Sequence, residues 1–369
     1  MRLMKLSDFS FELPEGRIAQ RPLDERDASR MMLLNRKNST WDDRTFRELP
    51  EILRGDELMV VNNARVIPAR LFGQRIGVRS QTPGKNNPAR SEYLTGKVEV
   101  LLTRSLGQGT WEALARPGRK MQVGERIIFG EGELEAEIIW RGELGLRKLR
   151  FTARGDFQQA IEKLGHVPLP PYIRRGDEPG DRSRYQTVFA REGSAVAAPT
   201  AGLHFTSGML ERLRKRGIEI CELTLNVGLG TFQPIHEDEV EKHKIHTEAY
   251  EITEETAYCI REAKSAKRPV LAVGTTVVRA LEDAAHKAGG AGKNGKLPGA
   301  GRAEADIFIY PGHKFRVVDQ MLTNFHLPKS SLFVMTSAFA GRELLLGAYR
   351  HAIEAGYRFY SYGDCMLID

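Results

Sequence analysis

Cysteine is scarce in this sequence, with three residues among 369. Cys221, Cys259 and Cys365 lie far apart, so the sequence shows neither a CxxC metal-binding pair nor a disulfide framework. Such sparse use of cysteine is typical of a reducing compartment, and we expect a cytoplasmic protein. Long hydrophobic runs are lacking as well. The most apolar stretch, residues 332–340, is far shorter than the roughly 20 residues that cross a bilayer, so no association with a membrane is expected.

The charge balance is modestly positive, because 55 lysines and arginines exceed 48 acidic residues by seven. Hydrophobic residues make up 41% and charged residues 28%, which excludes a mainly disordered chain. Five arginines gather in one stretch rich in proline and glycine, at positions 174, 175, 182, 184 and 191. This cluster favours a polyanionic partner, although a solvated face is the alternative.

Short strand-like segments follow one another in the first half of the chain. They cover residues 97–104, 111–115, 126–129, 134–140 and 146–153, with glycine-containing turns between them. Strands of this length at this regular spacing predict a small β-barrel or sandwich. The length of the whole chain, 369 residues, suggests two or three domains.

From residue 156 onward, predicted helices alternate with predicted strands, which is typical of an α/β fold with parallel strands. The helices cover 157–163, 206–217, 254–264, 276–288 and 342–355, and the strands cover 218–227, 269–273, 306–310 and 357–362. Asp156, Thr206, Thr253 and Ser330 are predicted to cap helices. We therefore predict an α/β protein with a discontinuous large mixed α/β domain, residues 1–64 and 154–369, and an inserted small β-barrel domain, residues 65–153.

Two segments place glycines where a ligand can approach the backbone. In residues 270–283, an apolar strand meets Gly274, Thr275 and Thr276 at the start of a helix, whose free N–H groups can bind a ligand. In residues 225–235, a strand breaks at two glycines, 228 and 230, which permits close approach. The alternatives are a plain strand-to-helix turn and a glycine-rich loop without a ligand.

Three segments carry histidines. His204 stands beside Phe205 just before a predicted helix, which suits a proton-transfer group next to a stacked base or an ordinary helix cap. His243 and His246 have a loose metal-ligand spacing, but HxxH alone is weak support for a metal, and we favour proton transfer or RNA contact. His326 lies with Asn324 and Lys329 ahead of a helix, where the cluster either binds a carboxylate or phosphate or forms a capped helix entry.

These segments belong to a set of ten that occur in one order along nearly the whole chain. They cover residues 6–22, 60–73, 165–173, 181–190, 198–206, 225–235, 243–248, 273–282, 323–333 and 360–368. In them the sequence resembles the S-adenosylmethionine:tRNA ribosyltransferase-isomerases of queuosine biosynthesis.

The resemblance implies an unusual use of S-adenosylmethionine. The ribosyl moiety is transferred to 7-aminomethyl-7-deazaguanine at the wobble position of a tRNA and is isomerised to an epoxycyclopentanediol. The products are epoxyqueuosine-tRNA, adenine and methionine. The resemblance further implies a large α/β domain with an inserted β-barrel, no cofactor beyond the co-substrate S-adenosylmethionine, no metal, and a monomer.

The reaction needs proton transfer at several steps, and we assign it as a hypothesis to four histidines: His204, His243, His246 and His326. The residues expected to bind S-adenosylmethionine are Thr200, Gly202, Phe205, Gly228, Gly230, Thr231, Phe232, Gly274, Thr275, Thr276 and Asn324, with Phe205 stacking on a purine. The residues expected to contact the tRNA anticodon loop are Arg182, Arg184, Tyr185 and Gln186, because single-stranded RNA is read by stacking and by arginine.

Two other functions remain open at this point. An S-adenosylmethionine-dependent RNA methyltransferase would share the donor and the RNA, but the glycine-rich loop that normally follows its first strand is not recognisable here. A non-catalytic RNA-binding protein would explain the arginine cluster, but it would leave the glycine, histidine and threonine segments without a role.

Overall fold

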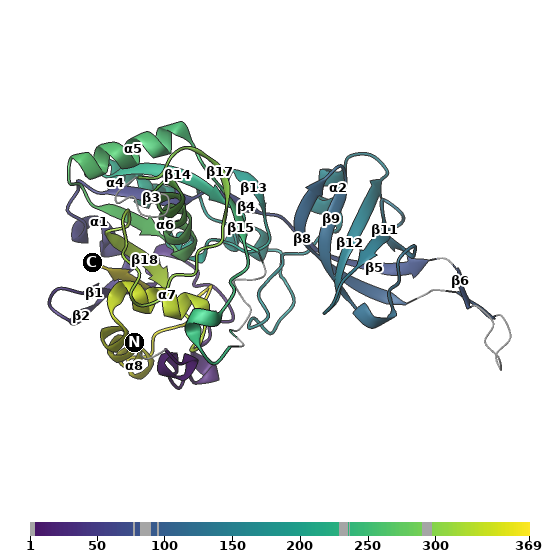
Figure 1. Ribbon diagram of the computed structural model, residues 1–369, viewed down its shortest axis with the longest axis horizontal. Helices are drawn as coiled ribbons and strands as arrows, with labels where there is room; N and C mark the ends of the chain where they lie inside the picture. The colour runs from purple at the N-terminus through teal and green to yellow at the C-terminus, as the bar shows by residue number, and fades with distance from the viewer. Residues whose placement is uncertain are drawn as a thin grey trace. The chain divides into compact units, whose positions relative to one another are not determined.

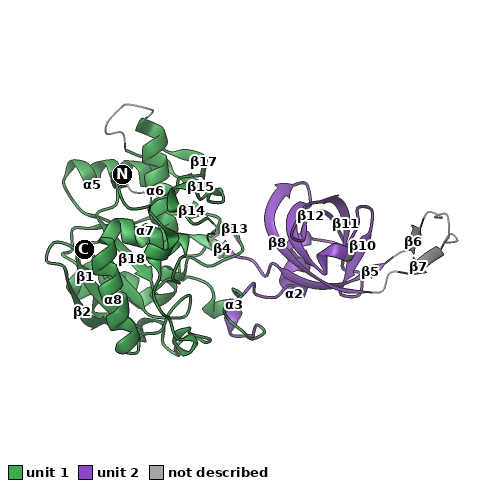
Figure 2. Ribbon diagram, turned by 60° about the horizontal axis from the view of Figure 1, so that its bottom comes forward, with its two compact units in different colours: residues 1–65, 170–176, 183–369 green, residues 66–169, 177–182 purple. Residues whose placement is uncertain are grey.

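The structure is a computed structural model that describes residues 4–76, 78–81, 90–93, 96–228, 235, 237–289 and 297–369. The chain forms two compact units (Figure 2). Unit 1 consists of residues 1–65, 170–176 and 183–369, and unit 2 consists of residues 66–169 and 177–182. Unit 2 therefore extends beyond the insert predicted at 65–153.

The centre of unit 1 is a β-sheet (Figure 1). It has nine strands in the order β17-β15-β14-β3-β16-β18-β19-β1-β2. The four neighbouring strands β14, β3, β16 and β18 are parallel to one another. Strand β19 pairs antiparallel with β18 and parallel with β1, so the sheet is mixed. The bounds are β1 (Arg30–Asn35), β2 (Thr40–Thr45), β3 (Leu58–Asn62), β14 (Glu219–Leu225), β15 (Glu248–Ile252), β16 (Val270–Val273), β17 (Gly301–Ala305), β18 (Gln320–Asn324) and β19 (Cys365–Ile368).

Both faces of this sheet are covered, as the buried strand β3 illustrates. Leu58 and Val60 belong to a core shared with helices α5 (Glu254–Ser265), α6 (Thr275–Gly289), α7 (Ser331–Ala340) and α8 (Arg342–Glu354). Met59 and Val61 belong to a second core, shared with η4 (Phe46–Glu48), α1 (Leu49–Ile52), η6 (Thr200–His204) and α4 (Ser207–Lys215). Successive side chains of a strand point to opposite faces, so an apolar run such as LMVVN suits a sheet buried on both sides. This confirms the predicted α/β class.

The predicted helix caps are confirmed. The side chains of Asp156, Thr206, Thr253 and Ser330 each accept a hydrogen bond from the backbone amide three residues later, at the starts of α2 (Phe157–Leu164), α4, α5 and α7. These side chains satisfy amides that a helix leaves without a partner in its first turn.

Two predicted strands are wrong. Residues 306–310 lie just after β17, and the carboxylate of Asp283 binds the amides of Asp306 and Ile307, which removes them from a strand ladder. Residues 357–362 lie before β19 and include Tyr360, whose φ of 74° interrupts an extended backbone. In both places the apolar composition suits a buried loop as well as a strand.

Unit 2 is a closed barrel with the strand order β10-β11-β12-β9-β8-β5. Its strands are β5 (Arg70–Ile76), β8 (Lys97–Gly107), β9 (Thr110–Arg116), β10 (Arg126–Phe129), β11 (Leu134–Arg141) and β12 (Leu146–Ala153). Helix α2 packs against β5 and β12, and Phe157 at its start stacks on Trp111 of β9 at 6.0 Å between ring centroids. Strands β10 and β12 have the bounds predicted from the sequence.

Short elements complete the two units. They are η1 (Leu6–Phe9), η2 (Glu15–Arg17), η3 (Arg26–Ala28), β4 (Ala64–Val66), β6 (Val78–Gln81), β7 (Arg90–Tyr93), η5 (Gly118–Lys120), α3 (Asp181–Arg184), β13 (Glu192–Ala195) and η8 (Val240–Lys242). Among the helices in the described ranges, none has both the length and the apolar character needed to cross a membrane.

Candidate active site

A cavity of about 460 Å³ lies within unit 1, where the neighbouring parallel strands β16 and β18 end. Open α/β sheets bind ligands at the carboxyl ends of their strands, and this volume is in the range of small-molecule sites. The lining residues come from segments far apart in the sequence: 6, 172, 198–201, 227, 235, 274–276, 323–330, 332 and 360–361. The cavity brings together six predicted site residues, namely Thr200, Gly274, Thr275, Thr276, Asn324 and His326.

Gly274 forms the sharp turn that brings α6 to the cavity. Its amide donates to the carbonyl of Leu322 in the neighbouring strand at 2.7 Å, and its φ is 95°. A side chain at this φ would strain the backbone, so glycine allows the strand to turn directly into the helix. As a result Thr275 and Thr276 stand at the cavity wall in the first turn of α6.

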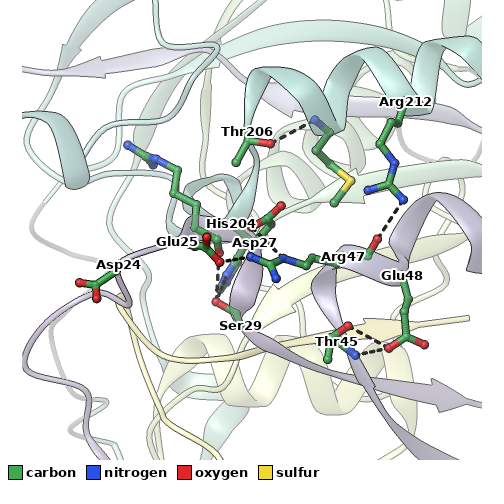
Figure 3. A network of polar contacts seen from close by, with 12 residues as sticks. Asp24, Glu25, Asp27, Ser29, Thr45, Arg47, Glu48, His204, Thr206 and Arg212 are labelled. Atoms are coloured by element: carbon green, nitrogen blue, oxygen red, sulfur yellow. Dashed lines mark hydrogen bonds and ion pairs between the residues drawn. The ribbon is translucent and has the colours of Figure 1, made fainter.

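A chain of hydrogen bonds connects the cavity wall with the interior of unit 1. The side-chain nitrogen of Asn324 lies 3.1 Å from the carbonyl oxygen of Tyr360 and 3.2 Å from His204 Nε2. His204 Nδ1 lies 2.9 Å from Ser29 Oγ. Figure 3 shows the two side chains next to each other. The hydroxyl of Ser29 donates to the carbonyl of Arg26 at 3.3 Å.

The donors and acceptors in this chain fix the protonation of His204. A carbonyl oxygen only accepts, so the group facing Tyr360 is the Asn324 nitrogen, which also donates to His204 Nε2. The proton of the neutral imidazole is therefore on Nδ1. Burial, followed by the nearby Arg26 and Arg358 guanidiniums, lowers the pKa of His204 to about 3. With both ring nitrogens engaged, His204 stays neutral and orients Asn324.

His326 is the predicted histidine that lines the cavity. Its Nε2 lies 2.8 Å from Thr323 Oγ1, and its backbone amide donates to the hydroxyl of Tyr349 at 3.0 Å. Its Nδ1 has no hydrogen-bond partner within the described ranges. Burial lowers the pKa of His326 to about 3, so the ring is neutral at physiological pH. A neutral ring nitrogen beside the cavity can exchange a proton with a ligand.

Two tyrosines of the cavity wall were not predicted as site residues. The rings of Tyr172 and Tyr360 have their centroids 4.0 Å apart, and the hydroxyl of Tyr172 lies 2.5 Å from Ser361 Oγ. Burial raises the pKa of both phenols, which remain neutral. Both residues lie in segments that carry the family resemblance, 165–173 and 360–368, but no local pattern marks them as ligand contacts.

A buried ion pair holds the segments around the start of α6. Arg279 Nη1 lies 2.7 Å from Glu248 Oε2, with side chains 6% and 5% exposed. The other oxygen of Glu248 accepts from the amide of Gly228 at 3.0 Å. Arg279 Nη2 donates to the carbonyls of His246 and Ala305 at 2.6 and 2.7 Å. Gly228 and His246 are thus tied to α6 through this pair.

His246 is exposed and lines a small second cavity of about 20 Å³ with Thr275 and Thr276.

Three predicted residues have positions that suit packing rather than ligand contact. Phe205 is fully buried and packs edge-on against Phe46 at 4.9 Å, so its ring has no free face for a purine. A Cβ at Gly202 would lie 2.6 Å from the ring of Phe189, so this glycine permits close packing. His243 contacts the ring of Phe308 and lies 3.5 Å from Glu237.

The predicted residues Gly230, Thr231 and Phe232 lie outside the described residues.

The four residues predicted to contact tRNA differ in exposure. Arg182 donates to the carbonyls of Glu162 and Gly165 and keeps 46% of its side chain exposed. Arg184 donates to the carbonyls of Leu23 and Asp24, both at 2.6 Å. Tyr185 is 1% exposed, which argues against stacking on a base. Gln186 is half-buried.

Potential metal ligands gather elsewhere in unit 1. Within the described ranges, the group that meets metal-ligand distances is Glu219, Cys221 and Cys259, whose ligand atoms lie within 4.8 Å of one another. Arg268 already pairs with Glu219 at 2.9 Å, and burial raises the pKa of Cys221, which disfavours the thiolate that a metal requires. These residues do not line the cavity.

Comparisons with known proteins agree with the resemblance. The family model described as "Queuosine biosynthesis protein" matches residues 6–368. A protein of Solibacter usitatus named S-adenosylmethionine:tRNA ribosyltransferase-isomerase is 57% identical over 367 residues, 99% of this chain and 100% of the relative. A protein of Desulfitobacterium hafniense with the same name is 46% identical over 365 residues, again 99% of this chain and 100% of the relative.

A solved structure of S-adenosylmethionine tRNA ribosyltransferase from Thermotoga maritima is also similar, with 34% identity and a TM-score of 0.52 over 98% of this chain and 100% of that one. The match therefore extends over both units, and the chain belongs to the queuosine biosynthesis protein family.

Proposed function

We propose that this protein is an S-adenosylmethionine:tRNA ribosyltransferase-isomerase. It transfers the ribosyl moiety of S-adenosylmethionine to 7-aminomethyl-7-deazaguanine at the wobble position of tRNA and isomerises it, giving epoxyqueuosine-tRNA, adenine and methionine. The observation that supports a site for this reaction is the cavity at the ends of β16 and β18. It gathers hydroxyls, an amide, a neutral histidine and two aromatic rings in a volume suited to a small donor molecule.

The chemistry explains why these groups are needed. The sulfonium of the donor acidifies the neighbouring 5′-carbon, so that a base can remove a proton there. Adenine then leaves, and a proton delivered to the purine assists its departure. The aminomethyl nitrogen of the base must be neutral to attack the sugar, and methionine leaves with the sulfur.

Among the four predicted histidines, His326 is assigned to proton transfer because it lines the cavity and its Nδ1 has no hydrogen-bond partner among the described residues. His204 is assigned as a positioning residue, since it acts through Asn324. His243 and His246 are assigned to shaping the segment before β15 rather than to chemistry. Tyr172 and Tyr360, in place of Phe205, are assigned to packing against the adenine.

Recognition of the tRNA is assigned in part to Arg182, which bonds to the end of α2, and to Arg184, which bonds to the backbone at positions 23 and 24. Replacing both by glutamine should flatten the salt dependence of tRNA binding, because fewer phosphate counterions are released. An unchanged slope would remove this assignment. We further propose that the enzyme acts as a cytoplasmic monomer without a metal, as the family resemblance implies.

The decisive test is incubation with S-adenosylmethionine and tRNA that carries 7-aminomethyl-7-deazaguanine, followed by mass spectrometry of the nucleosides. Epoxyqueuosine together with free adenine and methionine is the expected result. S-adenosylhomocysteine and a methylated nucleoside would instead indicate a methyltransferase. An intact donor in the presence of bound tRNA would indicate a non-catalytic RNA-binding protein.

A further inference from the structure

The N-terminus of α6 lacks the capping group that such a position normally has. Gly274 precedes the helix and has no side chain, and the first turn contains no acidic residue. The amides of Thr275 and Thr276 have no hydrogen-bond partner within the described ranges. In a helix of 15 residues these free amides carry partial positive charge, which attracts an anion.

The hydroxyl of Thr276 is a second, independent sign of a ligand at this place. Thr276 is 8% exposed, and its Oγ1 is enclosed without a partner among the described residues. A Cβ placed on Gly274 would lie 3.6 Å from this oxygen, so the hydroxyl points back over the start of the helix. Burying a polar atom without a hydrogen-bond partner costs free energy. A bound ligand that forms a hydrogen bond with this oxygen would offset that cost.

The charges of the cavity wall favour the same kind of ligand. The described lining residues include no aspartate or glutamate. Lys329 lines the cavity, and its ammonium has no ion pair among the described residues. Free amides, a hydroxyl and an ammonium together form the donor set that binds an oxyanion.

We propose that the N-terminus of α6, with Thr276 Oγ1 and Lys329, binds the carboxylate of the methionyl part of S-adenosylmethionine. This inference rests on the proposed function, which makes that molecule the donor. A phosphate of the tRNA is the other oxyanion present in the reaction. The carboxylate is favoured because Thr276 is more than nine-tenths buried, where a small molecule has easier access than a polynucleotide backbone.

The test compares S-adenosylmethionine with its decarboxylated form, which keeps the sulfonium, the ribose and the adenine. We would measure kcat/KM for each donor at saturating substrate tRNA, and the Kd of each donor by equilibrium dialysis in the presence of tRNA with guanine at the wobble position, which lacks the aminomethyl nitrogen and leaves the donor intact. The variants are Thr276→Val and Lys329→Met. The control is Thr336→Val, the same change at a buried threonine of α7 whose hydroxyl bonds to the carbonyl of Leu332 and which does not line the cavity.

For the unmodified enzyme, kcat/KM should be about 10-fold or more higher for S-adenosylmethionine than for the decarboxylated donor. This is the typical effect of losing charge-assisted hydrogen bonds to a carboxylate. Thr276→Val and Lys329→Met should each reduce that preference by weakening only the carboxylated donor, whereas Thr336→Val should leave it unchanged. Equal weakening of both donors, or no weakening, would overturn the proposal. Unchanged donor binding with weaker, less salt-dependent tRNA binding would assign the site to phosphate instead.

Failure of this inference is distinguishable from failure of the proposed function. If epoxyqueuosine forms but the preference does not respond to the variants, only the carboxylate site is wrong. If no product forms, the proposed function is wrong, and the dialysis measurements still decide whether the site binds the carboxylate.

Discussion

Among the described residues, each of the two units contains a buried arginine–glutamate pair, and the two pairs differ in what they hold. In the barrel, Arg75 of β5 contacts Glu125, next to β10, at 2.8 Å, with side chains 9% and 8% exposed. In unit 1, Arg279 and Glu248 contact each other at 2.7 Å and also bind the backbone at positions 228, 246 and 305. The barrel pair joins β5 to the residue before β10, whereas the pair in unit 1 joins β15, the end of β17 and two loop positions to α6, whose first turn lines the cavity. Two pairs of similar burial therefore hold different parts of the fold, a strand pairing in the barrel and the segments around the start of α6 in unit 1.

Removing one partner of each pair tests this difference and should give the largest effects. Arg75→Met and Arg279→Met each leave a buried carboxylate without its cation, which should lower the free energy of unfolding by about 3–5 kcal/mol. Only Arg279→Met should also raise the Kd for S-adenosylmethionine, by about 10-fold, a change of 1.4 kcal/mol. Denaturant unfolding and equilibrium dialysis measure the two quantities. If both variants weaken donor binding equally, the distinction between the pairs is lost.

A smaller but specific effect is expected at His326. His326→Gln removes the ring that we assign to proton transfer, and the single-turnover rate should fall by about 100-fold or more. His286→Gln is the matched control, because His286 is exposed in the last turn of α6. A rate for His326→Gln within about twofold of the control would show that proton transfer does not pass through this residue.

Lowering the pH should destabilise unit 1 before it destabilises the barrel. His204 and His326 have a pKa of about 3 in the folded state against about 6.5 when unfolded. Between these pKa values the unfolded chain binds more protons than the folded chain. The free energy of unfolding is therefore not reduced by these histidines above pH 6.5, and it falls as the pH decreases below that value. The slope is up to about 1.4 kcal/mol per pH unit for each histidine. Hydrogen exchange at pH 7.5 and 5.5 should show lost protection in β16 and β18 first. Earlier loss in β8 and β9 would contradict this order.

The smallest effect is expected at His204. His204→Ala removes the acceptor that orients the Asn324 amide, and the KM for S-adenosylmethionine should rise about 10-fold. His204→Gln, which keeps a carbonyl acceptor, should recover part of the loss. The pH profile of kcat between pH 6 and 9 should stay unchanged in both variants, because His204 does not titrate there. A shifted profile would make His204 a proton-transfer group after all.

The sequence predicted the barrel better than the site. Alternating apolar residues between fixed turns define strands such as β10 and β12 to the residue, because pattern and burial agree there. The strand predicted at residues 357–362 is wrong because an apolar loop and a buried strand have the same composition, and the φ of Tyr360 is set by tertiary contacts. The role of His204 was equally out of reach, since Ser29 and Asn324 meet it only in the folded chain. Gly274, by contrast, can be identified from the sequence. A strand that leads directly into a helix needs a sharp turn, and glycine adopts the positive φ of that turn without strain.

The fate of the donor's sugar tests the central claim most directly. The purified protein would be given S-adenosylmethionine labelled with ¹³C throughout the ribosyl group, together with tRNA carrying 7-aminomethyl-7-deazaguanine. The account predicts that every labelled ribosyl carbon appears in the modified nucleoside, while adenine and methionine are released without label. Label that remains attached to adenine, with or without methylation of the RNA, would contradict it.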